Sequence, residues 1–164
     1  MLSVLASAVL AAAAPAGAQA PQVLGNNPDA CRPGAEGSAA LVTVHGFKDR
    51  VGRLRVQNYR GTKEDYLVEG HYLHREEVPV TPAGDITLCL PLPGPGDYAI
   101  VALHDRDSNG RLSIWSDGIG FSRNPRLGLA KPAADHVVIS FGPGVTPVRI
   151  VLNYRRGLSV RPIG

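Results

Sequence analysis

DYAIVALH, residues 97–104, is the stretch that decides the fold. Alternate positions of an extended chain point to opposite sides, and here apolar residues fill both sets of positions. The run is short and is preceded by Gly and Pro, which favours a strand over a helix. We therefore expect a central β-strand that other parts of the chain cover on each face.

Further short runs of this kind lie on both sides of the central strand. In RLRVQ, residues 53–57, Leu54 and Val56 share one face while charged or polar residues occupy the other. The remaining runs are ALVTVHGF (40–47), EEVPV (76–80, a short edge strand), DITLCLPL (85–92), HVVISF (136–141) and PVRIVLNY (147–154). The pattern predicts an all-β fold, a two-layer antiparallel β-sandwich of immunoglobulin-like or transthyretin-like type with about seven strands.

One short helix at most is expected. TKEDYLVEGHYLHR, residues 62–75, opens with Thr62 three places before Asp65, which is a variant of the capping box, although Gly70 weakens the segment midway. His71 and His74 would share a helix face, as two metal ligands do, but no third ligand is evident nearby. We interpret both histidines as solvent-facing.

The N-terminus has the pattern of a secretory signal. An apolar run from Leu2 to Ala14 is followed by small residues, which predicts a signal peptide at residues 1–18, with cleavage as late as residue 20. The run is too short for a transmembrane segment. We expect an exported, periplasmic or extracellular monomer with an extended segment at 19–37, a sandwich domain at 38–155 and a C-terminal tail at 156–164.

Two cysteines, Cys31 and Cys89, are the whole cysteine content. An even count in an exported chain predicts one disulfide. Cys89 lies on the opposite strand face from Ile86, Leu88 and Leu90, so the bridge is expected to hold the early segment across the outer side of a sheet.

The charge pattern limits the class of partner. The formal net charge is +3, with acidic and basic residues interspersed. A nucleic-acid-binding surface would show clustered basic residues, so no nucleic-acid partner is expected. An envelope protein or a polysaccharide is the partner class that fits an exported domain of this composition.

The connection after the central strand, residues 104–127, is far longer than an ordinary hairpin loop. A calcium loop needs oxygen ligands at positions 1, 3 and 5, glycine at 6, a backbone carbonyl at 7 and an acid at 12. The first five requirements are met by Asp105, Asp107, Asn109, Gly110 and, through its carbonyl, Arg111. Position 12 is Ser116, and Asp117 comes one place late. Two interpretations remain: a weak calcium site, with calcium as the cofactor, or a plain tight turn.

The same loop carries other candidate ligand-binding side chains, namely His104, Trp115, Phe121, Ser122 and Asn124. Trp115 and Phe121 either stack on a sugar or peptide or anchor the loop to the core. His104 with a loop serine (Ser113, Ser116 or Ser122) would suit a small hydrolase. No G-x-S-x-G motif is present, and neighbours on a strand point to opposite faces, so His104 and Asp105 are not expected to pair.

GDYAIVALHDRDSNGRLSIWSDGIGFSRNPR, residues 96–126, resembles the signature of the bacterial domain-of-unknown-function 2141 family, in which a strand ending in His-Asp leads into an Asp/Asn/Gly loop. The resemblance extends over residues 38–154, from LVTVHGFKDRVGRLRVQNY to VTPVRIVLNY. Arg123 departs from the small polar residue of many relatives. The resemblance implies an exported β-sandwich, and it implies no activity and no catalytic residue.

The sequence thus predicts an exported binding or envelope-associated structural module whose loop 104–127 carries a ligand or an ion. The alternative is a small periplasmic hydrolase that uses His104 and a loop serine.

Overall fold

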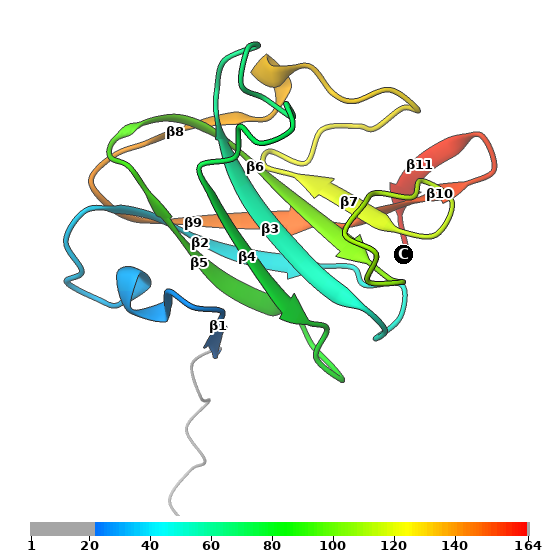
Figure 1. The fold of residues 1–164 in the computed structure, drawn as a ribbon, viewed down its shortest axis with the longest axis horizontal. Helices are drawn as coiled ribbons and strands as arrows, with labels where there is room; N and C mark the ends of the chain where they lie inside the picture. The colour runs from blue at the N-terminus through cyan, green and yellow to red at the C-terminus, as the bar shows by residue number, and fades with distance from the viewer. Residues whose placement is uncertain (1–21, 164) are drawn as a thin grey trace, which may run out of the picture.

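The computed structural model describes residues 22–163, so the predicted signal peptide lies outside the described residues. The fold is all-β, with two sheets packed face to face as a sandwich (Figure 1). Among residues 22–163, no helix is long and apolar enough to cross a membrane. The predicted fold class is confirmed.

A four-stranded sheet forms one layer. Its strands, in spatial order, are β1 (Val23–Leu24), β5 (Ile86–Leu92), β2 (Ser38–His45) and β9 (Gly144–Val151). β2 pairs antiparallel with β5, whereas β1 runs parallel to β5 and β9 runs parallel to β2. These two parallel pairs, at the edges of this layer, are an addition to the antiparallel pattern that the sequence predicts.

A seven-stranded sheet forms the other layer. In spatial order it contains β11 (Ser159–Pro162), β10 (Asn153–Arg156), β7 (Gly118–Phe121), β6 (Gly96–Asp105), β3 (Arg53–Arg60) and β4 (His74–Pro79), with β8 (Val138–Phe141) paired to the first part of β6. All pairs in this sheet are antiparallel. The run 147–154 therefore divides between the layers, because β9 ends at Val151 and β10 begins at Asn153 in the other sheet.

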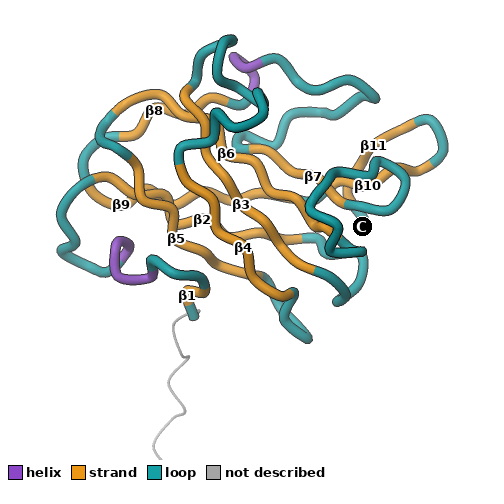
Figure 2. Tube along the Cα trace, in the orientation of Figure 1, coloured by secondary structure: helices purple, strands orange, loops and turns teal. Residues whose placement is uncertain are grey.

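The central strand is β6, and it is covered on both faces as predicted. Tyr98, Ile100 and Ala102 pack in the core between the two sheets. Ala99 and Val101 face a second, smaller apolar cluster, which also contains Tyr59, Tyr66, Phe121, Ala134 and Val137. The segments 61–73 and 122–137 supply part of this second cluster, so the outer side of the seven-stranded sheet is partly roofed by loops (Figure 2).

The N-terminal segment is held against the sandwich at two places. A disulfide joins Cys31, at the end of the short 3-10 helix η1 (Pro28–Cys31), to Cys89 in β5, with the two Cα atoms 5.8 Å apart. Glu76 of β4, which is buried, accepts hydrogen bonds from the backbone N–H of Asn26 (3.0 Å) and from the side-chain amides of Asn26 and Asn27. The predicted disulfide is confirmed.

Two segments have a local structure that the sequence pattern did not specify. Residues 62–70 form turns and no helix: the Thr62 hydroxyl does accept the Asp65 N–H (3.2 Å), but the chain continues into an extended strand rather than a second helical turn. The expected tail at 156–164 contains β11, because Gly157, with φ +63°, reverses the chain so that β11 pairs with β10. Val160 is buried as a result.

The long connection also contains a strand. β7 lies within the segment that the sequence predicts to be a single loop, and it pairs with the second half of β6. Its glycines permit this position: a Cβ on Gly120 would lie 2.5 Å from Ile150 Cγ2 of β9, and one on Gly118 would overlap the ring of Tyr154. β7 has too few apolar side chains for sequence periodicity to reveal it.

Candidate metal centre

The ladder between β6 and β7 brings the two ends of loop 106–117 together. His104 of β6 is paired with Gly118 of β7. Because antiparallel pairing continues outward in register, Asp105 and Asp117 leave the ladder at the same place. Asp117 comes one position too late for the calcium-loop spacing, yet the sheet returns it to the side of the first aspartate.

Three carboxylates meet at this place. Asp105, Asp107 and Asp117 each offer an oxygen, and these oxygens all lie within 4.8 Å of one another. Asp105 and Asp117 are buried, at 1% and 3% exposure, whereas Asp107 is exposed. One open side beside two buried acids is an arrangement through which a hydrated cation can enter.

The N-terminal half of the loop is a tight turn built around Asp105. Asp105 Oδ1 accepts the N–H of Asn109 (3.2 Å), and Asp105 Oδ2 accepts the N–H of Gly110 (2.7 Å). Ser108 and Gly110 have positive φ, at 57° and 78°, as such a turn requires. Asn109 Oδ1 accepts the N–H of Arg111 (2.7 Å), so Arg111, whose carbonyl the sequence predicts as a ligand, is held in the same turn.

Asp117 organises the C-terminal half of the loop. Its Oδ1 accepts the N–H of Arg106 (3.1 Å) and the hydroxyl of Ser116 (3.1 Å), and its Oδ2 accepts the N–H of Ser113 (2.8 Å). A carboxylate oxygen has two lone pairs, so these bonds leave acceptor sites on all three aspartates. The turn and a cation site therefore use the same groups without excluding each other.

No basic side chain neutralises this cluster. Within residues 22–163, none of the three aspartates forms an ion pair with Lys, Arg or His. The nearby guanidinium of Arg106 is directed elsewhere: its Nε donates to Asp49 Oδ2 (2.9 Å) and its Nη1 donates to the Ser116 carbonyl (3.0 Å). Hydrogen bonds from Arg106 hold the pKa of Asp49 below its ordinary value.

His104 is not a free catalytic base. It is fully buried; its Nδ1 lies 2.7 Å from the Tyr154 hydroxyl and its Nε2 lies 2.8 Å from the Val51 carbonyl. Since a carbonyl only accepts, Nε2 carries the proton and Nδ1 accepts from Tyr154. Burial lowers the pKa of His104, which keeps the ring neutral. Neither ring nitrogen contacts a serine, so the serine–histidine pair of the hydrolase alternative is not formed.

The other predicted ligand residues separate into structural and exposed ones. Phe121 is buried in the second cluster, and the Ser122 hydroxyl lies inside the fold, where it contacts the Val137 carbonyl and the N–H of Ile100. Asn124 joins the loop to β9 through the Arg149 carbonyl (2.9 Å) and the Val151 N–H (2.8 Å). These three side chains support the fold.

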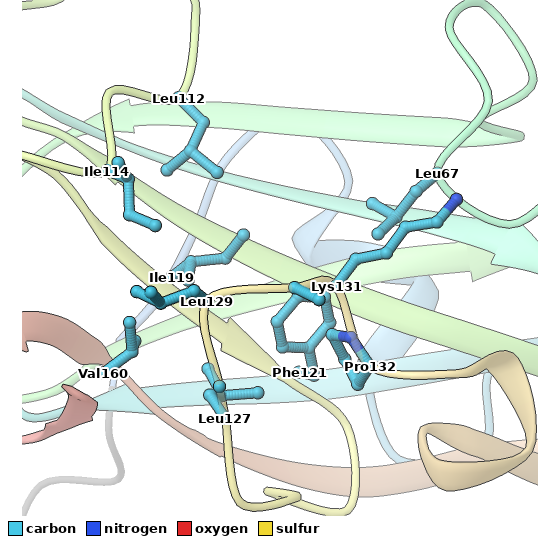
Figure 3. A pocket seen from close by; sticks show the side chains of 12 residues that line it. Leu67, Leu112, Ile114, Ile119, Phe121, Leu127, Leu129, Lys131, Pro132 and Val160 are labelled. Carbon is cyan, nitrogen blue, oxygen red and sulfur yellow. The ribbon is translucent and has the colours of Figure 1, made fainter. Parts of the chain in front are cut away.

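Of the two roles considered for Trp115, anchoring the loop to the core does not hold. Its side chain is 74% exposed, and the guanidinium of Arg155 lies 3.5 Å from the ring centre. An apolar groove crosses the outer side of the seven-stranded sheet (Figure 3). Its floor and walls include Leu67, Leu112, Ile114, Ile119, Leu127 and Leu129.

Sequence reasoning missed three residues around the site: Asp49, Arg106 and Tyr154. Asp49 lies in the turn before β3 and Tyr154 in β10, and only the fold brings them to the end of β6. No spacing or motif in the sequence marks their contact.

The fold and the carboxylate cluster together define a disulfide-bonded β-sandwich with an acidic loop at one end. The chain belongs to the family described as "Uncharacterized protein conserved in bacteria (DUF2141)", which it matches over residues 42–149. That range includes the acidic loop but excludes Cys31 and the hairpin of β10 and β11. Searches of curated proteins and of solved structures found no match.

Proposed function

We propose that this protein is an exported binding module in which loop 105–117 takes up one calcium ion. The bound ion would fasten the end of β6 to the start of β7 and fix the loop surface that meets a partner. An envelope protein or a polysaccharide is the partner class that we propose.

The observation that carries the proposal is that the pairing of β6 with β7 places Asp117 beside Asp105 and Asp107. Oxygens of the three carboxylates lie within 4.8 Å of one another, and no basic side chain among residues 22–163 pairs with them. The three negative charges therefore repel one another. A divalent cation removes this repulsion, and calcium prefers carboxylate and carbonyl oxygens with flexible geometry. The Asn109 amide oxygen and the Arg111 carbonyl would add neutral ligands.

The expected affinity is low. Extracellular calcium modules bind with dissociation constants of about 10⁻⁴–10⁻³ M. Here Asp107 is exposed, and each carboxylate already accepts hydrogen bonds, so the site is expected to fall in that range. Magnesium keeps its water shell and demands a stricter octahedral geometry, which favours calcium at this open site.

Thermal unfolding with and without calcium tests the proposal. With a dissociation constant of about 1 mM, about 10 mM calcium stabilises the folded state by about 1.4 kcal/mol. The melting temperature of the wild-type protein should therefore rise by a few degrees over that in EDTA, and magnesium should raise it less.

Asp107→Asn should abolish the rise in melting temperature without weakening the fold, because the Asp107 side chain is exposed. Asp135→Asn, another exposed aspartate in η2 (Ala134–His136), is the matched control and should respond as the wild type does. An equal response in Asp107→Asn, or none in the wild type, would contradict the calcium site.

A further inference from the structure

Large apolar side chains project into solvent at one end of the molecule. Leu112, Trp115, Leu129 and Leu158 are exposed by 48%, 74%, 54% and 85%. Within the described residues only Val51 and Tyr72 are other large hydrophobic side chains of comparable exposure. We call the four side chains the loop-tip patch.

The members of the patch come from three segments of the chain. Leu112 and Leu129 line the same apolar groove, together with Val160 of β11 (Figure 3). Trp115 and Leu158 line a second hollow, together with Arg155. Loop 106–117, segment 122–132 and the β10–β11 hairpin all extend toward this end of the sandwich (Figure 1).

Basic residues lie close to the patch residues along the chain, and Lys131 lines the groove itself. Arg111, Lys131, Arg156 and Arg161 are exposed, and none forms an ion pair within residues 22–163. Arg155 lies over the Trp115 ring. Of the three carboxylates of the acidic loop only Asp107 is exposed, and the nearby Asp49 is paired with Arg106. The surface thus combines protruding apolar groups with uncompensated positive charge.

We propose that the loop-tip patch docks on the surface of an anionic lipid bilayer. Tryptophan is favoured at the boundary between lipid headgroups and acyl chains, and leucines beside it add apolar contact with the chains. Each Lys or Arg near an anionic surface adds electrostatic attraction. The groove floor at Ile119 and Leu127 gives an acyl chain an apolar place beside the inserted tips.

A second copy of the chain fits the patch less well. In a symmetric dimer the patch would face itself. The basic residues of one copy, Arg111, Lys131, Arg156 and Arg161, would then face the same set of basic residues on the other, and like charges brought together at an interface oppose association. The charge pattern complements anionic headgroups and opposes self-association. The inference does not depend on the calcium site, so its test is made in EDTA.

Trp115 is the only tryptophan of the chain, so tryptophan fluorescence reports the surroundings of the loop-tip patch. The protein, purified from a host that exports it, is mixed with vesicles of phosphatidylglycerol and phosphatidylcholine at low salt. We expect tryptophan emission to move to shorter wavelength, to be quenched by brominated acyl chains, and to stay unchanged with pure phosphatidylcholine. Added salt should reverse the shift, because it screens the headgroup attraction.

Matched variants separate the contribution that apolar insertion makes to vesicle binding from the contribution of positive charge. Leu158→Ser should weaken vesicle binding about tenfold, since a buried leucine contributes at least that factor, whereas Val51→Ser, at an exposed site outside the patch, should not. Lys131→Gln and Arg156→Gln should each weaken it about fivefold. Lys63→Gln, an exposed lysine on another loop, is the charge control.

Two results would overturn the proposal. One is tryptophan emission that does not change with anionic vesicles at low salt. The other is a shift to shorter wavelength that appears without vesicles as the protein concentration rises, which would assign the patch to contact between copies of the chain.

Discussion

Asp117 lies beside Asp105 because the residues that precede and follow them, His104 and Gly118, form a ladder pair between β6 and β7. The sheet, not the loop spacing, closes the acidic site. Asp117 also accepts two backbone N–H groups from the loop, from Arg106 and Ser113. It therefore holds the loop in shape and supplies the third carboxylate of the cluster.

Asp117→Asn should affect both roles. An amide offers one acceptor oxygen in place of two, so one of the backbone hydrogen bonds is lost at a cost of about 1.5–3 kcal/mol in EDTA. The rise in melting temperature with calcium should also disappear. Chemical unfolding in EDTA and in calcium measures both effects, and a variant that keeps the full calcium response would show that Asp117 is not a ligand.

The buried His104 should make stability depend on pH. Burial lowers its pKa in the folded state, so the unfolded chain takes up a proton at higher pH than the folded chain does. The stability contributed by neutral His104 is therefore complete above about pH 6.5 and is lost as pH falls below that value, at up to about 1.4 kcal/mol per pH unit.

Urea unfolding at several pH values between about 7.5 and 5.5 measures this slope. His104→Asn should show a smaller slope than the wild type. His136→Asn, at an exposed position, should keep the wild-type slope. Equal slopes for the wild type and His104→Asn would mean that this ring does not titrate differently in the folded and unfolded chains.

The disulfide should contribute substantially to stability. It joins residues separated by 58 positions, and the chain-entropy relation gives about 4 kcal/mol for a loop of that size. Replacing both cysteines, Cys31→Ser with Cys89→Ser, should lower the free energy of unfolding by that amount. Adding a reductant to the wild type should have the same effect, and an unchanged unfolding midpoint after reduction would contradict the assignment.

The close approach of β7 to β9 should make Gly120 intolerant of a side chain. An alanine Cβ there would lie 2.5 Å from Ile150 Cγ2 and 2.8 Å from the Val151 carbonyl. Overpacking of this kind costs about 1–3 kcal/mol. Gly128→Ala is the control, because nothing lies within 4 Å of its added Cβ. If both variants unfold at the same denaturant concentration, β7 does not pack against β9 as described.

Much of the fold could be predicted from the sequence because period-two patterns mark half-buried strands. Residues 97–104 carry apolar side chains on both faces of the strand, which identified β6 as the central strand. The two cysteines predicted the disulfide. β7 and β11 were not predictable in this way, since β7 contains two glycines and β11 has a single buried residue, Val160. Their pairing depends on neighbouring strands, which local patterns do not describe.

The candidate site was predictable only in part. The spacing of Asp105, Asp107 and Asn109 indicates a turn or a calcium loop by itself. The closing role of Asp117 depends on the register of β6 and β7, and the contact of Trp115 with Arg155 depends on the position of the β10–β11 hairpin. The sequence left open whether Trp115 is buried or stacks on a ligand, and the fold leaves it at the surface.

The central claim is that loop 105–117 binds calcium, and an NMR titration of the backbone amides tests it most directly. The account predicts that the amides of Asn109, Gly110 and Ser113, which donate to the clustered carboxylates, shift together and saturate at calcium concentrations of about 10⁻⁴–10⁻³ M. Amides that do not shift at those concentrations, or small shifts spread over exposed acids across the whole surface, would contradict it.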